Sequence, residues 1–177
     1  MAADKKETWL NWLAVTTVIF SACATLSSFR GSSFSTRAIM AQTNAANQWA
    51  YFQSKSVKQH TCEIAKDQIE LQLSSIADSS LAEIYRKRIG YYSSEILRYD
   101  TEKAEALVAA KAFERNRSDF QEHSAQFAMG VVYLQVAIVL SALAALIKKK
   151  PVWVLGVASG TVGLFYFWIG IFWKVIP

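Results

Sequence analysis

The residues of this chain that could carry chemistry are few and lie far apart. His60 and Cys62 are separated by one residue, and imidazole and thiolate are ligands that zinc prefers. A zinc site needs three or four such ligands, and the sequence holds no second cluster, so we expect no metal and no cofactor. The other cysteine, Cys23, lies in a long uncharged run, and we expect no disulfide between it and Cys62.

Catalytic motifs are also missing from the sequence. It contains no glycine-rich phosphate loop, no zinc-binding pair of histidines and no nucleophile elbow. The residues offer no acid, base and nucleophile that would converge. We therefore predict that the protein is not an enzyme.

Three uncharged runs account for much of the chain, at residues 9–29, 124–147 and 152–173. A helix of about 20 residues, rising 1.5 Å per residue, matches the roughly 30 Å hydrocarbon core of a bilayer. A buried core helix could explain one such run, but the remaining protein is too small to bury three. The sequence therefore predicts an all-α membrane protein with three transmembrane helices, surrounded by membrane lipid. No charged residue lies within a run, which disfavours an ion-coupled transporter.

The first run has an alternative interpretation as a cleaved signal peptide. Lys5 and Lys6 precede it, and Ala22-Cys23-Ala24 resembles a cleavage site. Residues 20–23 even approximate the motif at which a cysteine is lipidated after cleavage. We favour a retained span, because Phe20 stands where that motif usually has leucine.

Lysines next to the spans indicate the orientation of the chain. Lys148, Lys149 and Lys150 form most of a short loop at 148–151, and Lys5 and Lys6 lie in the tail at 1–8. With three spans, these two regions face the same side, which the positive-inside rule identifies as the cytoplasm. The segment 30–123 and the tail 174–177 then face outward, into the periplasm of a bacterium.

The net charge of +5 does not indicate nucleic acid as a partner. The segment 30–123 carries nearly equal numbers of basic and acidic residues, and the excess of lysine lies beside the spans. Basic residues at these places are the ones that determine membrane topology.

The segment 30–123 is expected to form a long antiparallel, coiled-coil-like helical hairpin, with its turn near 74–80. In the second arm, aromatic residues and one alanine recur every seven residues, which predicts a seam that faces a partner helix. This seam comprises Tyr85, Tyr92, Tyr99, Ala106, Phe113, Phe120 and Phe127, widened by Ile89 and Ile96. On the first arm, we expect one looser apolar face that contains Trp49, Phe52, Val57, Ile64 and Leu71.

Two details of the hairpin have alternatives. The aromatic seam is interpreted as the hairpin core, and a ligand-binding surface is the second possibility. Ser80 with Glu83 fits a capping box that would begin the second arm. Since two helices bury little surface, we expect neighbouring copies to complete the core.

Small residues at helical spacing give each span a face that another backbone can approach closely. These faces contain Ala14 and Ser21 in the first span, Ala137 and Ser141 in the second, and Gly156, Gly160 and Gly163 in the third. Three such faces predict a homo-oligomer. Just outside the first span, amide and hydroxyl side chains between Gln42 and Gln48 could surround a central opening, although a solvated polar face explains them as well.

Three motifs resemble an uncharacterised bacterial family, catalogued as domain of unknown function 4337. They are WLNWLA at 9–14, STRA at 35–38 and QWAYFQSKSVK at 48–58. The chain departs from the family pattern at Asn47, Phe52 and Ser54. The resemblance covers nearly the whole chain, and it implies a bacterial inner-membrane protein without supplying an activity.

From these observations we expect a non-enzymatic homo-oligomeric membrane protein that acts as a scaffold or a platform for a protein partner. Two alternatives remain open at the level of sequence. The first is a channel-like oligomer that conducts ions or small solutes, and the second is a membrane protein that senses a ligand through its hairpin.

Overall fold

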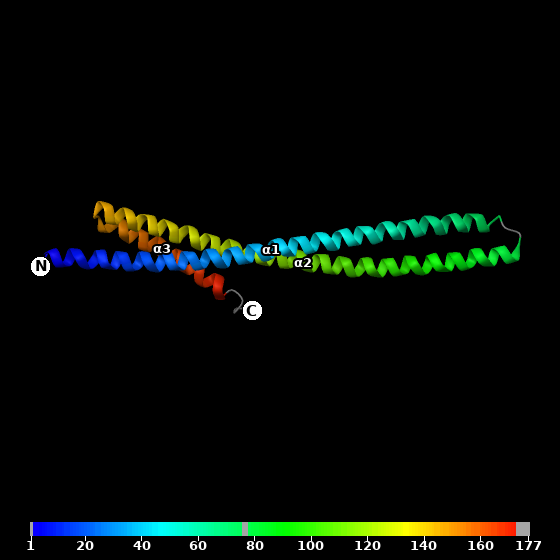
Figure 1. Ribbon diagram of the computed structural model, residues 1–177, viewed down its shortest axis with the longest axis horizontal. Helices are drawn as coiled ribbons and strands as arrows, with labels where there is room; N and C mark the ends of the chain where they lie inside the picture. The colour runs from blue at the N-terminus through cyan, green and yellow to red at the C-terminus, as the bar shows by residue number, and fades with distance from the viewer. Residues whose placement is uncertain (1, 76–77, 173–177) are drawn as a thin grey trace. The chain divides into compact units, whose positions relative to one another are not determined.

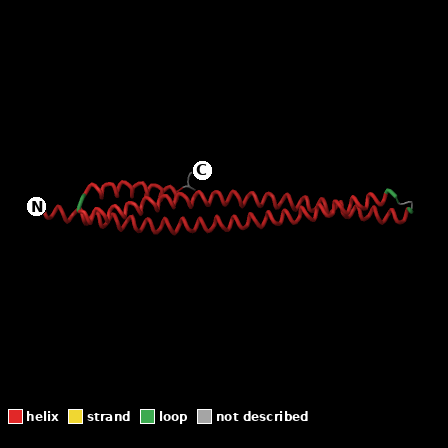
Figure 2. The backbone as a smooth tube through the Cα atoms, turned by 90° about the horizontal axis from the view of Figure 1, so that it is seen from above, coloured by secondary structure: helices red, strands yellow, loops and turns green. Residues whose placement is uncertain are grey.

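The computed structural model describes residues 2–75 and 78–172, with side chains from Thr8 onward. Its elements are α1 (Ala2–Leu73), α2 (Ser79–Ile147) and α3 (Lys150–Phe172), shown in Figure 1. Figure 2 shows that short loops separate these helices, and the described part of the chain contains no strand. The protein is therefore all-helical. Part of the predicted turn, the side chains of Lys5 and Lys6, and the predicted C-terminal tail lie outside the described residues.

The chain divides into two compact units, and both α1 and α2 contribute to each of them. The three-helix unit contains residues up to Ile39 and from Ser118 onward, and the hairpin unit is Met40–Arg117. This division lies inside the predicted hairpin segment of 30–123. The three-helix unit extends beyond the uncharged runs because Phe34 packs against both Phe120 and Phe127, with ring centroids 6.4 and 5.9 Å apart.

Gly31 allows α1 and α2 to approach closely within the three-helix unit. A Cβ atom at this position would lie 3.2 Å from the Cβ of Phe127. The hydroxyl of Ser124 donates a hydrogen bond of 3.0 Å to the Gly31 carbonyl, which joins the two helices. Apart from Gly31, α1 contains neither glycine nor proline, so its backbone has no strong local helix breaker.

The N-terminus of α2 is capped by Asp78. Its Oδ1 atom accepts hydrogen bonds from the backbone N–H and the hydroxyl of Ser80, each 2.9 Å long. These bonds, the backbone one foremost, hold the pKa of the Asp78 carboxyl below its usual value. The predicted capping box of Ser80 and Glu83 is wrong, because the cap is Asp78, two residues earlier, and Ser80 already lies inside α2, which begins at Ser79.

The connection from α2 to α3 is short and strongly bent. Lys148 has a φ angle of 55°, the left-handed conformation that often ends a helix and that glycine adopts most easily. Helix α3 begins two residues later at Lys150, and Pro151 lies in its first turn, where a missing backbone N–H does no harm.

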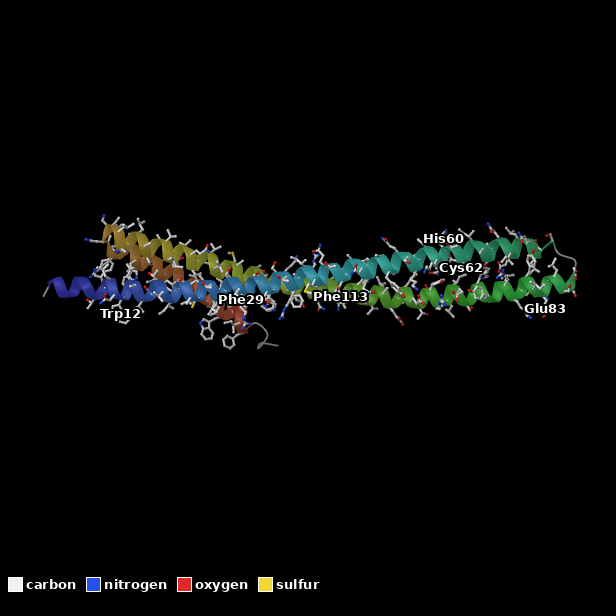
Figure 3. All side chains as sticks on the ribbon, viewed as in Figure 1. Trp12, Phe29, His60, Cys62, Glu83 and Phe113 are labelled. Atoms are coloured by element: carbon white, nitrogen blue, oxygen red, sulfur yellow. The ribbon has the colours of Figure 1, made fainter. Side chains whose placement is uncertain are left out.

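Each of the three helices contains a stretch that is long and apolar enough to cross a membrane by length and composition. Much of the apolar surface in these stretches faces outward. On α1, for example, Trp12 is 64% exposed and Phe29 is 75% exposed, and Figure 3 labels both side chains.

Candidate functional site

The three-helix unit has a small core made by all three helices. One cluster joins Phe20 and Ala24 of α1 to Leu134 and Ala137 of α2, with Leu164 of α3 packed beside it. A second cluster joins Trp9 and Leu13 to Ala144, with Trp153 alongside. These contacts are apolar, and they position the helices without creating a reactive centre.

The glycines of α3 form the closest contacts in this unit. A Cβ atom on Gly163 would lie 2.8 Å from Cγ of Leu134 and 3.0 Å from the carbonyl oxygen of Gly130. One on Gly156 would lie 3.2 Å from the carbonyl oxygen of Ala137, and one on Gly160 would collide with the ring of Phe20. The small faces predicted on the second and third spans are therefore used for packing within one chain.

The other predicted small residues fall into two groups. Ala137 and Ser141 are fully buried on α2, in agreement with the use of this face inside the unit. Ala14 and Ser21 lie on an exposed part of α1. Of the predicted small faces, the one on α1 is therefore left open to a neighbour.

A serine-rich groove of about 420 Å³ lies between α1 and α2 in the three-helix unit. Its lining includes Ser27, Ser28, Ser32, Ser124 and Val131. The hydroxyl of Ser27 is buried and has no hydrogen-bond partner among the described residues. Hydroxyl groups without a neighbouring base or acid can form hydrogen bonds but supply no catalytic group.

Elsewhere in the unit, side-chain hydrogen bonds connect the helices. The indole N–H of Trp153 donates to the hydroxyl of Thr16 at 3.2 Å, and the hydroxyl of Ser159 donates to the carbonyl of Tyr133 at 3.0 Å. The rings of Tyr133 and Tyr166 are stacked with centroids 5.8 Å apart. These polar groups have partners inside the unit, which favours a structural role for them.

The hairpin unit packs α1 and α2 in opposite directions. Trp49 donates a hydrogen bond to Glu114, Lys55 pairs with Glu102, and Lys103 donates to Gln59. From the contact of Trp49 with Glu114, through that of Lys55 with Glu102, to the groove that Ile69 shares with Tyr85, the residue number on α2 falls as that on α1 rises, so the two segments are antiparallel.

The predicted seam of the second arm lies on the side of α2 that packs against α1. Within the hairpin unit, the predicted residues Tyr85, Ile89, Tyr92, Ile96, Tyr99, Ala106 and Phe113 are all buried or half-buried. Ala82, Lys103 and Ala110, which were not predicted, complete their alternating spacings of three and four. The last two predicted members, Phe120 and Phe127, belong to the three-helix unit. Figure 3 shows Phe113 on α2.

The first arm differs from the prediction. Trp49 and Phe52 are half-buried and pack edge to face, with ring centroids 5.8 Å apart. Val57, Ile64 and Leu71, predicted on the same face, are instead 66%, 47% and 73% exposed. The reason is geometric, because five residues separate Phe52 from Val57 and a helix turns about 100° per residue. The two side chains therefore point about 140° apart, and the prediction had merged two faces into one.

Polar residues, among them Lys55 and Gln59, share the inner face of the first arm with Trp49 and Phe52. The ammonium of Lys55 lies 2.5 Å from a carboxylate oxygen of Glu102, and 4.9 and 5.5 Å from the ring centroids of Tyr51 and Tyr99. Arg98 adds a contact of 3.4 Å to the other oxygen of Glu102. Together these groups form a cation–aromatic cluster that fixes the register of the two arms.

The charged groups in this cluster change one another's pKa values. The hydrogen bond from Lys55 is the main reason that the pKa of the Glu102 carboxyl is lowered. The same bond, followed by one to Tyr51, raises the pKa of Lys55. Both groups therefore keep their charges around neutral pH, as a structural ion pair requires and a proton-transfer site does not.

A second polar contact lies along the same seam. The ammonium of Lys103 donates a hydrogen bond of 2.8 Å to Oε1 of Gln59 and lies 5.6 Å from the ring centroid of Phe52. Neither cluster could be recognised from the sequence pattern, because charged residues usually face solvent. One signal was available, since Lys103 stands at a position of the seven-residue pattern that Ile89 and Ile96 occupy earlier.

His60 and Cys62 do not form a metal centre in the described structure. The imidazole of His60 is 74% exposed and lies 3.3 Å from a carboxylate oxygen of Glu63, while Cys62 is half-buried. Residues 8–75 and 78–172 contain no group of three or more potential metal ligands among His, Cys, Asp and Glu. Cys23 and Cys62 are both free thiols.

Comparison with known proteins gives one match. A family model described as "Domain of unknown function (DUF4337)" matches residues 9–173. No curated protein and no solved structure matches the chain.

Proposed function

This chain belongs to the DUF4337 family, and we propose that it is a non-enzymatic, homo-oligomeric membrane scaffold. In this proposal its three apolar stretches span a bacterial inner membrane. Its antiparallel, coiled-coil-like hairpin stands in water and serves as a platform for a protein partner. The observation that carries the proposal is the continuity of α1 and α2, each of which leads from an apolar stretch into the hairpin unit without a break.

The exposure of the apolar stretches supports the membrane part of this proposal. Only 17%, 28% and 22% of the most apolar windows in α1, α2 and α3 are buried inside the chain. In water, such a surface would be strongly unfavourable, whereas lipid solvates it. Backbone groups in all three segments are satisfied within the helices, as a spanning segment requires.

The proposed topology follows from the lysines. The loop with Lys148, Lys149 and Lys150 lies in the cytoplasm together with the N-terminus, and the hairpin and the C-terminus lie in the periplasm. The balanced charges of the hairpin unit are compatible with export, because long translocated segments largely escape the charge rule.

The scaffold is favoured over the channel by the packing inside one chain. The channel hypothesis depended on small-residue faces that surround a pore, together with the amides near Gln42. Because Gly156, Gly160 and Gly163 pack against α1 and α2 of the same chain, these faces are not available to surround a pore. The oligomer of the scaffold then relies on the exposed face of α1 that contains Ala14 and Ser21. The ion pairs of the hairpin likewise support a structural role.

The oligomeric state tests the proposal directly. The full-length protein, in detergent and in lipid nanodiscs, should have a mass that is a multiple of the 19.8 kDa chain after correction for bound lipid. A monomer in both environments would contradict the scaffold.

A further inference from the structure

Two adjoining grooves between α1 and α2 of the three-helix unit form one recess, which we call the hydroxyl groove. Their volumes are about 420 and about 490 Å³, and Ser28, Ser32 and Val131 line both of them. The wall on α1 carries hydroxyl groups at spacings of three and four: Thr25, Ser28, Ser32 and Ser35. The wall on α2 is apolar between a hydroxyl and an amide: Ser124, Ala128, Val131, Val132 and Gln135. The recess therefore offers hydrogen bonds on one side and hydrocarbon contacts on the other.

Several polar groups of the hydroxyl groove have no partner within the chain. Ser27 lines the groove with a fully buried side chain, and its hydroxyl makes no hydrogen bond with the described residues. The side chains of Ser28, Ser32 and Gln135 likewise form no hydrogen bond within residues 8–75 and 78–172. A polar group that is kept from water is destabilising unless it finds a partner, and lipid hydrocarbon supplies none. The groove therefore requires an occupant that accepts hydrogen bonds.

The lining indicates the chemistry of this occupant. None of the described residues that line the two grooves is charged, so a charged group would lose its water without gaining a counter-ion. Hydroxyl groups donate hydrogen bonds to carbonyl oxygens, and the valines and Phe29 provide contacts for hydrocarbon chains. A helix of a second copy is a poor occupant, because its backbone carbonyls already accept hydrogen bonds within the helix.

The position of the groove along α1 matches the ester region of a lipid. Thr25 and Ser28 belong to the uncharged run 9–29, whereas Ser32 and Ser35 lie beyond its end. A helix rises about 15 Å over these ten residues. On the proposed topology, this part of α1 passes from the hydrocarbon core into the outer interfacial layer, where the ester carbonyls of glycerophospholipids lie. These carbonyls accept hydrogen bonds and donate none, as the hydroxyl wall requires.

We propose that the hydroxyl groove binds a glycerophospholipid of the outer leaflet. Its ester carbonyls accept hydrogen bonds from Ser28 and Ser32, and one of its acyl chains lies along Val131 and Val132. The inference rests on the proposed membrane insertion and adds a specific ligand to it. Recognition through the ester groups leaves the headgroup outside the groove, so anionic and zwitterionic phospholipids should bind alike.

Native mass spectrometry of the full-length protein in detergent, titrated with phospholipid, tests this site. Two lipids with the same phosphocholine headgroup and the same chain length are compared, one with ester-linked and one with ether-linked chains. The ether lipid lacks the carbonyl acceptors and should bind about tenfold more weakly, the loss expected for two hydrogen bonds. The double variant Ser28→Ala, Ser32→Ala should bind both lipids equally weakly. Both serines are exposed, so the variant should keep the helical content of the original chain.

A second variant tests the groove without altering its hydroxyl groups. Ala128 is exposed on α2 and lines the groove, so Ala128→Phe should fill the recess and remove the binding of both lipids. Val139→Phe, at an exposed position of α2 outside the groove, is the matched control and should leave binding unchanged. Thr161→Ala, exposed on α3 and also outside the groove, should keep the preference for the ester lipid.

The possible results separate this inference from the proposed function. Equal binding of the ester and ether lipids by the original protein would overturn the lipid site, and so would an unchanged preference in Ser28→Ala, Ser32→Ala. If Ala128→Phe abolished the oligomer and left lipid binding unchanged, the groove would be a contact between copies and the lipid site would be wrong. The membrane scaffold stands after each of these results. A protein that stayed dissolved without detergent would remove both proposals.

Discussion

At the scale of single residues, charged side chains form part of the contact between the two arms of the hairpin. Lys55 and Lys103 lay their ammonium groups near aromatic rings, and Glu102 accepts from Lys55. An exposed ion pair contributes little by itself because water and salt screen it. In this cluster, aromatic contacts and a second cation, Arg98, accompany the pair, so we expect its loss to be measurable.

Glu102→Gln should lower the melting temperature of the hairpin at neutral pH. The lowered pKa of Glu102 means that its stabilising effect is present above the usual carboxyl value of 4.5 and is lost as the pH falls through the lowered value. Melting curves followed by circular dichroism from neutral to acidic pH should therefore show a smaller decrease in melting temperature for the variant than for the original protein. Equal pH dependence in the two proteins would contradict the role of this ion pair.

Two glycine substitutions should have opposite effects. Gly163→Ala would place a Cβ atom against Leu134 and Gly130, and overpacking of this kind costs about 1–3 kcal/mol. Gly90→Ala meets nothing within 4 Å and should stabilise α2 by up to about 1 kcal/mol, because alanine is the better helix former. Unfolding in mixed detergent micelles measures both free energies. A stabilising Gly163→Ala would show that α3 does not pack on α2 through its glycines.

At the scale of elements, the helices could be predicted from the sequence, but the orientation of one of them could not. Long uncharged runs and the seven-residue pattern of the second arm indicated the three helices. The seven-residue pattern from Tyr85 to Phe113 indicated which side of α2 faces α1. On the first arm, Trp49 and Phe52 belong to one face and Val57 to another, and the prediction joined them because it counted apolar residues without their angles. The rest of the inner face could not be recognised from apolar residues, because Lys55 and Gln59 occupy part of it.

The start of α2 provides a test at this scale. Asp78→Ala should speed hydrogen exchange at the first amides of α2, since the N–H of Ser80 loses its acceptor. Asp78→Asn keeps an acceptor and should behave nearly as the original. Glu83→Gln serves as the matched control, because the cap does not involve it. Mass spectrometry of peptides around residues 79–85 measures the exchange, and slower exchange in Glu83→Gln than in Asp78→Ala is the expected order.

At the scale of the whole molecule, the distribution of charge governs the proposed topology. A reporter fused after the C-terminus should be active only if it reaches the periplasm. Replacing Lys148, Lys149 and Lys150 together by glutamine should lower the activity of this reporter, because the short loop loses the charges that retain it in the cytoplasm. Replacing Arg86, Lys87 and Arg88, in the long hairpin, should leave placement unchanged. If the reporter on the original protein is inactive, the C-terminus lies in the cytoplasm and the assigned orientation is wrong.

The left-handed backbone at Lys148 has a consequence for how this chain can vary. Judged by dihedral angles alone, glycine is the preferred residue at such a helix end, and lysine there is strained. On the proposed topology, the same position is one of three that hold the loop on its side of the bilayer. Stability of the helix end and insertion thus make competing demands on one position, because Lys148→Gly would relieve the backbone strain while it removed one of the charges that orient the chain in the membrane.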